Sequence, residues 1–276
     1  SAACAVAGQA VSLVGLLLIV DSSQDYVLAV AAQGIAPVVA SVLAWGWLVR
    51  TRAVRFVVPG WSAVGRQLRE GWPFFVSTAS VSLYTTSNVV LLGLVSHPQV
   101  VGYFAAAEKL IRAVQGLLAP VSQAIYPHVT RLALDSRAKA LEFLHRLLKY
   151  QGSCMLLLSV AVFGLADPIV RALFGAEFVE SILVLQCLSA LPFIVGLSNV
   201  LGVQTMLNFD MQSAFHRLLL AAGFINVTLV LVLAAAFGAP GAALGVVATE
   251  LIVLVMMGLE TRRAGLLLPL MRGEAR

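Results

Sequence analysis

A series of long apolar runs constrains this chain more than any other feature. A helix needs about 20 mostly apolar residues to cross a bilayer. Runs of this kind cover roughly 2–20, 27–49, 72–95, 101–130, 150–166, 179–207, 214–237 and 240–260. Transmembrane β-strands would be about 10 residues long with strict alternation, and these continuous runs lack that pattern. We therefore predict an all-α integral membrane protein with about eight transmembrane helices.

The composition supports a membrane protein. Hydrophobic residues make up 60% of the chain and charged residues only 11%, whereas a soluble domain averages about 25% charged residues. The three cysteines, Cys4, Cys154 and Cys187, match no metal-binding or redox spacing. The sequence has no Walker loop, no HExxH and no GxSxG motif. We therefore expect a protein that is not an enzyme and that has no cofactor and no metal.

Basic residues lie on alternate connections between the runs. They are Arg50, Arg52, Arg55, Arg66 and Arg69 after the second run, Arg131, Arg137, Lys139, Arg146 and Lys149 after the fourth, Arg217 after the sixth, and Arg262, Arg263, Arg272 and Arg276 in the tail. The intervening connections, such as DSSQD and SHPQ, contain almost none. The positive-inside rule places the basic connections and the C-terminus in the cytoplasm. This distribution accounts for the net charge of +5 without a nucleic-acid partner.

Two connections are longer than turns. Residues 53–71 include Pro59 and Gly60 and are typical of a cytoplasmic linker. This linker would separate residues 1–52, with two helices, from residues 72–260, with six, and residues 261–276 would form a cytoplasmic tail. Residues 134–149 place leucines on one helical face and bases on the other, which predicts an interfacial helix on the cytoplasmic leaflet.

The fourth run is exceptional because it contains charged residues. Glu108, Lys109 and Arg112 lie in its outer half, and Glu108 and Arg112 are spaced to form an i,i+4 pair. A polar stripe on one face also includes Gln115, Ala119, Ser122 and Tyr126. Two interpretations remain open. The stripe lines a cavity suited to an anion such as a phosphate, or it forms a structural ion pair near the outer surface with Lys109 reaching toward that surface.

A few other polar residues interrupt the apolar runs. Glu250 lies near the middle of the last run and is interpreted as a proton or cation site, as a partner for a cation on another helix, or as a protonated structural carboxyl group. Asn88, Asn199, Gln204 and Asn226 are expected mainly to hydrogen-bond between helices. Pro120, Pro127 and Pro192 predict kinks or breaks.

Two stretches resemble a known family. VGYFAAAEKLIRAVQGLLAPVSQAIYPHVTRL resembles the corresponding helix of bacterial O-antigen and polysaccharide flippases, which belong to the multidrug/oligosaccharidyl-lipid/polysaccharide exporter superfamily. DPIVRALFGAEF is similar to a short periplasmic element of the same superfamily. Members have about twelve helices in two six-helix lobes. The resemblance implies that these runs are helices five to twelve of a fragment that begins at Ser1, so that 1–52 holds the last two helices of the N-terminal lobe.

The resemblance also implies a function. Such a protein moves an undecaprenyl-diphosphate-linked oligosaccharide across the bacterial inner membrane by alternating access, for O-antigen or exopolysaccharide synthesis. Arg112 and Lys109 become the candidates for the diphosphate, with Glu108, Gln115 and Asn88 as further candidate cavity residues and Glu250 as the candidate for ion coupling. The bilayer and the lipid-linked sugar are the expected partners, and a polysaccharide polymerase and a chain-length regulator are further candidates. A multidrug/cation antiporter of the same fold and a non-transporting subunit of a polysaccharide assembly complex are the alternatives.

Overall fold

The computed structural model describes residues 7–14, 26–51 and 60–266. It contains two compact units, Ser1–Leu68 and Arg69–Arg276. In the first unit, residues 7–14 form a helix that approaches α2 (Tyr26–Arg50) closely, with Gly8 against the carbonyl of Ala36. The predicted first run therefore lies partly outside the described residues, as do Cys4, Arg52, Arg55, Pro59, Arg272 and Arg276.

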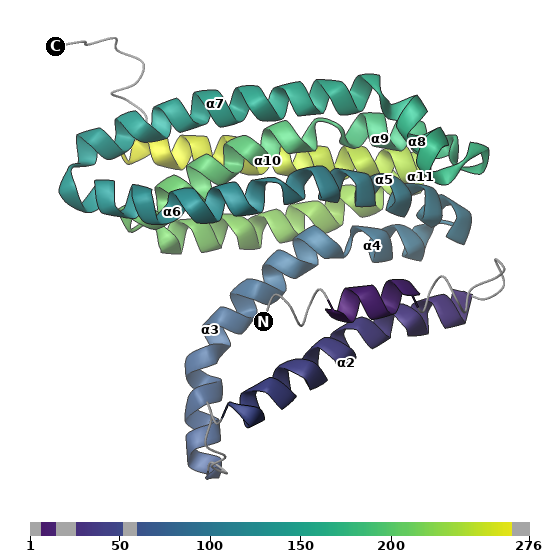
Figure 1. Cartoon of the computed structure of the whole chain (residues 1–276). Helices are drawn as coiled ribbons and strands as arrows, with labels where there is room; N and C mark the ends of the chain where they lie inside the picture. The colour runs from purple at the N-terminus through teal and green to yellow at the C-terminus, as the bar shows by residue number, and fades with distance from the viewer. Residues whose placement is uncertain (1–6, 15–25, 52–59, 267–276) are drawn as a thin grey trace. The chain divides into compact units, whose positions relative to one another are not determined.

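Most of the described chain lies in the second unit, and every regular element that the structure describes is a helix (Figure 1). The elements after α2 are α3 (Trp61–Thr86), α4 (Asn88–Val95), α5 (Pro98–Gly116), α6 (Leu118–Asp135), α7 (Arg137–Gly164), α8 (Ala166–Phe174), η1 (Ala176–Phe178), α9 (Glu180–Leu188), α10 (Leu191–Asn199), the π-helix η2 (Val200–Thr205), η3 (Met206–Phe209) and α11 (Gln212–Arg263). The prediction of an all-α fold is confirmed for these residues.

Three helical stretches among the described residues are long and apolar enough to cross a membrane. They are Arg137–Gly164, Glu180–Phe209 and Gln212–Arg263. The last contains two of the predicted helices, because Gly238 has non-helical angles (φ 62°, ψ −138°) that separate its two arms. Glycine suits this left-handed backbone, since it has no Cβ to clash with the following carbonyl oxygen. The predicted boundary in FGAPG is therefore confirmed.

The connections of the second unit gather at two ends of the bundle, as the alternating charges predict. At one end, Gly238 lies beside Val100, just after the α4–α5 turn, and α8 with η1 lies at the same end (Figure 1). At the other end, the guanidinium of Arg137 donates to the carbonyl of Ala264 at 3.2 Å, and the hydroxyl of Thr130 lies 2.6 Å from the amide oxygen of Asn208. Which end faces the cytoplasm stays a prediction.

Several predicted helix bounds are wrong. The run 101–130 is two helices, α5 and α6, which meet at Leu117. The break agrees with the prediction from Pro120, which has no backbone N–H for the carbonyl of Gly116 four residues before it. Pro127, by contrast, lies inside α6 and does not end it. The run 72–95 is likewise divided between α3 and α4 at Ser87. The predicted break at Pro192 is confirmed, since this residue lies in the first turn of α10.

The predicted interfacial helix 134–149 is also wrong. Residues 137–149 are the first half of α7, which continues without interruption into the predicted span that follows. Leu141 and Leu144 are buried against Val129, Val200 and Leu266. The leucine face therefore packs inside the bundle instead of lying on a leaflet. The linker predicted at 53–71 stays a prediction, and α3 begins inside it at Trp61.

The largest hydrophobic core lies where α4, α5, α9 and the two arms of α11 meet. Its members include Leu92, Phe104, Ile111, Leu185 and Val230, each at most 1% exposed. The same helices carry the charged and amide side chains considered next, so the core fixes their positions.

Candidate functional site

A cavity of about 150 Å³ lies between α4, α5, α9, α10 and the second arm of α11. Its lining consists of Asn88, Phe104, Glu108, Ile111, Arg112, Gln115, Leu188, Leu191, Val195, Val246 and Glu250. Five of the six residues that the sequence singled out as candidate site residues therefore surround one space. They come from three helices that are far apart in sequence.

One face of α5 provides most of the polar lining. Glu108, Arg112 and Gln115 follow one another at helical spacing and point to the same side. Phe104 and Ile111 are buried in the core on the adjoining part of this face, which holds α5 against α9 and α11. These three residues of the predicted stripe therefore lie along one wall of the cavity.

The predicted ion pair is present at this wall. Nη2 of Arg112 donates to Oε1 of Glu108 at 3.0 Å. The Glu108 side chain is only 13% exposed, whereas that of Arg112 is 43% exposed. The carboxylate is thus held in the interior, and part of the guanidinium is still accessible to a ligand that enters the cavity.

Two other helices add Glu250 and Asn88 to the lining. Glu250 projects from the second arm of α11, a helix that packs against α4, α5, α9 and α10. Asn88 is the first residue of α4 and is 2% exposed. Its Oδ1 accepts no hydrogen bond within the described part of the chain. A buried acceptor of this kind is costly unless a donor reaches it, so the cavity has a place for a donor group.

Lys109 is the exception among the candidates. Its side chain is exposed and is not part of the cavity lining. It lies one residue from Glu108, which rotates it by about 100° around the helix axis. No group of three or more His, Cys, Asp or Glu side chains suited to a metal ion occurs among the described residues.

Ser122, which the sequence placed on the same stripe, has a different role. Its hydroxyl and carbonyl oxygens both accept from Nε2 of Gln204, at 2.9 and 3.1 Å. Gln204 belongs to the π-helix η2 and is 1% exposed. The prediction that Gln204 hydrogen-bonds between helices is confirmed. The break at Leu117 explains why the stripe divides between two sites.

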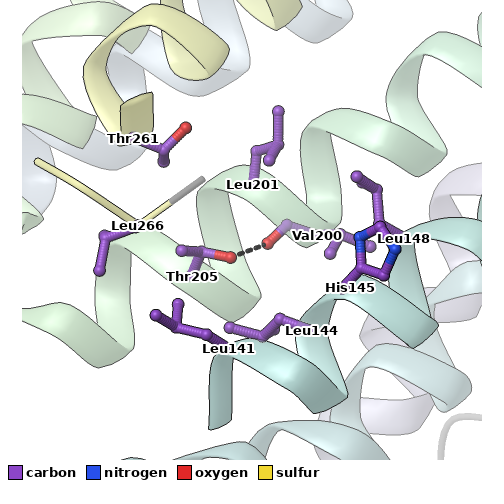
Figure 2. Close-up of a pocket in the computed structure, with 9 residues that line it drawn as sticks. All are labelled: Leu141, Leu144, His145, Leu148, Val200, Leu201, Thr205, Thr261 and Leu266. Carbon is purple, nitrogen blue, oxygen red and sulfur yellow. Dashed lines mark hydrogen bonds between the residues drawn. The ribbon is translucent and has the colours of Figure 1, made fainter. Parts of the chain in front are cut away.

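A smaller cavity of about 20 Å³ lies on the other side of η2. Figure 2 shows Leu141, Leu144 and His145 of α7 facing Val200 and Thr205, whose hydroxyl donates to the Val200 carbonyl at 2.8 Å. The rest of its lining is Leu148, Leu201, Thr261 and Leu266. It is nearly all apolar, so it lacks the charged groups that make the larger cavity a candidate site.

The apolar walls of the larger cavity were not predicted. Leu188, Leu191 and Val195 come from α9 and α10. Leucine and valine are typical of any spanning helix, so no sequence signal separates these three from their neighbours.

Comparison with known proteins shows what the whole chain is similar to. Residues 4–133 match the family model described as "Polysaccharide biosynthesis protein". The chain is 34% identical to the "Putative O-antigen transporter" of Escherichia coli (strain K12) over 255 residues, which is 91% of this chain and 60% of that protein. The chain is thus similar in sequence to a putative O-antigen transporter over most of its own length. A "Putative O-antigen transporter" of Shigella dysenteriae is 26% identical over 258 residues, 92% of this chain and 64% of that protein. The chain thus spans less than two thirds of either relative, and the predicted family resemblance is confirmed.

A solved structure shows the same fold. The "Lipid II flippase MurJ, inward closed conformation" superimposes with a TM-score of 0.76 at 14% sequence identity. The match covers 94% of this chain and 55% of that protein. This chain is therefore a multi-pass membrane protein that shares its fold with part of that structure.

Proposed function

We propose that this chain is part of a flippase that moves an undecaprenyl-diphosphate-linked oligosaccharide from the cytoplasmic to the periplasmic leaflet of the bacterial inner membrane. The observation that carries the proposal is the cavity that holds the guanidinium of Arg112 among buried apolar and polar side chains. The names of its curated relatives, both putative O-antigen transporters, support the same substrate class. The product would supply O-antigen or exopolysaccharide assembly.

The chemistry of the cavity suits an anionic headgroup. Guanidinium presents several donors in a planar fork that matches phosphate oxygens. The exposed part of Arg112 would contact the diphosphate, while Gln115 and Asn88 offer amide groups for phosphate or sugar oxygens. Glu250 is the candidate for proton or cation coupling, because an ionisable group at membrane depth is costly and usually functional. Lys109, which lies outside this lining, is not included.

The topology follows from the loop charges. The end of the bundle with Arg131 and Arg137 would face the cytoplasm, and the end with Gly238 would face the periplasm. Eight transmembrane helices of a twelve-helix, two-lobe protein would then belong to this chain. Alternating access would open the cavity to one side at a time. A polymerase and a chain-length regulator are candidate partners on the same reasoning.

A cation antiporter of the same fold is the second candidate function. The observation in its favour is that two carboxyl groups, Glu108 and Glu250, line the cavity. Against it, Glu108 is already neutralised by Arg112. A non-transporting subunit is disfavoured, because Arg112 lines an internal cavity.

The test is complementation of a strain that lacks the transporter. The full-length protein with Arg112→Ala should lose most surface polysaccharide, because the proposed diphosphate contact is removed. Lys109→Ala is the matched control, since it removes a neighbouring positive charge outside the cavity and should leave most of the polysaccharide. Full polysaccharide with Arg112→Ala would contradict the proposed site. Unchanged polysaccharide together with altered drug sensitivity on overexpression would instead support the antiporter.

A further inference from the structure

The lining of the larger cavity contains more negative than positive groups. Glu108 and Glu250 are acidic and Arg112 is basic, and no other described lining residue is charged. With all three ionised, one positive and two negative charges leave the lining net negative. A diphosphate diester brings two further negative charges. Like charges in a low-dielectric site repel strongly, so this lining as it stands would resist the anion that Arg112 attracts.

Among the described residues, the helices packed on α5 add no further charged side chain to the lining. α4 and α10 contain no ionisable side chain. The ionisable groups of the other helices packed on α5 that do not line the cavity are Glu180 and Cys187 of α9, Tyr126, His128, Arg131 and Asp135 of α6, and His216, Arg217, Glu260, Arg262 and Arg263 of α11. On α5 itself, Tyr103 packs on Phe178 and Lys109 lies outside the cavity. The balance of charge is therefore set by the two carboxyl groups and Arg112.

The single positive charge of Arg112 cannot fully neutralise both Glu108 and a bound anion. Nη2 of Arg112 donates to the Glu108 carboxylate at 3.0 Å, and a phosphate bound to another edge of the guanidinium would share the same single positive charge. An incoming phosphate would thus compete with Glu108 for Arg112. The Glu108 side chain is 13% exposed, so its carboxylate would then lie nearly buried beside an added anion. A buried carboxylate without a cation partner is neutralised by taking up a proton.

Asn88 indicates that the cavity has a place for a further hydrogen-bond donor. It is 2% exposed, it lines the cavity, and its Oδ1 accepts no hydrogen bond within the described residues. An ionised carboxylate only accepts hydrogen bonds, whereas a protonated carboxyl group also donates one. A protonated carboxyl group would therefore add a donor to those that Gln115 and Arg112 already bring to the lining.

We infer that Glu108 takes up a proton when the diphosphate engages Arg112, so that protons and the anion bind together in this cavity. The inference rests on the proposed function and deepens it by naming how that site is regulated. The Arg112–Glu108 hydrogen bond breaks, a guanidinium–phosphate hydrogen bond forms, and a proton from solvent binds a Glu108 carboxylate oxygen. Arg112 keeps its own proton throughout.

This linkage has a definite sign. If protonation raises the affinity for the anion, the anion raises the affinity for the proton by the same factor. The diphosphate should therefore bind more tightly as pH falls, by up to about tenfold per pH unit for each proton taken up. Protons and substrate would not compete for the cavity, so a simple exchange of one for the other at this site is excluded.

The experiment is isothermal titration calorimetry of the full-length protein in zwitterionic nanodiscs near pH 7. The probe is a short-chain prenyl-diphospho-N-acetylglucosamine, a diphosphate diester with no proton of its own that titrates near neutrality. Titrations in two buffers with different ionisation enthalpies give the number of protons taken up. The expected result is about one proton per bound probe, with weaker binding as pH rises.

Three variants locate the proton. Glu108→Gln keeps the side-chain shape and should bind with little proton uptake and a flat pH dependence. Glu142→Gln is the matched control, because Glu142 also pairs with an arginine four residues later, Arg146, but on an exposed surface; it should behave like the unmodified protein. Proton uptake that is lost in Glu250→Gln but kept in Glu108→Gln would overturn the assignment.

The remaining outcomes of the titrations distinguish a failure of this inference from a failure of the proposed function. Probe binding with no proton uptake, or with proton release, would overturn this inference and leave the proposed function standing. No probe binding by a folded protein would overturn both. Equal proton uptake when phosphatidylglycerol in the nanodisc is the only added anion would mean that a lipid headgroup, and not the diphosphate, is the ligand.

Discussion

Replacing Gly245 by alanine should weaken the hairpin formed by the two arms of α11. A methyl group on Gly245 would lie 3.0 Å from both the Cα and the N of Val230 and 3.1 Å from the carbonyl carbon of Leu229. These atoms belong to the backbone of the first arm and cannot rotate away. The arms would have to separate by a few tenths of an ångström, and the contacts of Val230, which is fully buried, would loosen.

The expected cost follows from the usual effect of overpacking. Extra methyl groups in a packed core typically cost 1–3 kcal/mol. A loss of about 2 kcal/mol would lower the Tm by about 4–8 °C for a chain of this size. Gly241→Ala should be more harmful, because its methyl group would lie 2.6 Å from the carbonyl carbon of Leu233 and would collide with the carbonyl oxygen.

The assay is thermal unfolding of the detergent-solubilised protein. Gly258→Ala on the same helix is the matched control, because its methyl group would meet only Leu201 Cδ1, at an ordinary 4.0 Å. Alanine is a better helix former than glycine by roughly 0.5–1 kcal/mol, so this control should be neutral or slightly stabilising. If Gly245→Ala were as stable as Gly258→Ala, the close approach of the two arms described here would be incorrect.

Three further outcomes test other parts of the bundle. Gln204→Leu should cost about 1 kcal/mol and Gln204→Ala about 3 kcal/mol. Leucine fills the buried volume and removes an amide oxygen that accepts no hydrogen bond within the described chain, whereas alanine leaves a cavity; equal Tm values would contradict this reasoning. Gly238→Ala should cost about 1–2 kcal/mol, because φ is +62° there, and a rise in Tm would exclude that backbone conformation. Arg171→Ala should cost about 0.5 kcal/mol or less, since Arg171 and Asp167 are 52% and 53% exposed. A Tm loss of several degrees would mean that this pair is more protected than the structure indicates.

The α5 wall of the site could be predicted because the relevant interactions are local. Glu108 and Arg112 are four residues apart, and helical periodicity alone brings them onto one face with Gln115. Local backbone chemistry likewise predicted the turn at Gly238, where glycine permits a positive φ, and the break at Pro192, where proline lacks the N–H of a helix interior. Helical geometry also predicts that Lys109 lies outside the polar stripe. The sequence did not decide whether its long side chain could nevertheless contact the diphosphate.

Only the tertiary structure decided which faces meet. Glu250 and Asn88 join Glu108 and Arg112 because the second arm of α11 packs against α4 and α5. Ser122 turns to Gln204 because the helix breaks at Leu117.

The sequence by itself determined the helical class, the alternation of charged connections and the ion pair on α5, because each depends on residues close together in the chain. The tertiary structure decided that the leucines at 141 and 144 are buried and that five candidate residues share a cavity. An apolar face can pack equally well on lipid or on another helix. That choice depends on the shape of neighbours far away in sequence, which periodicity does not describe.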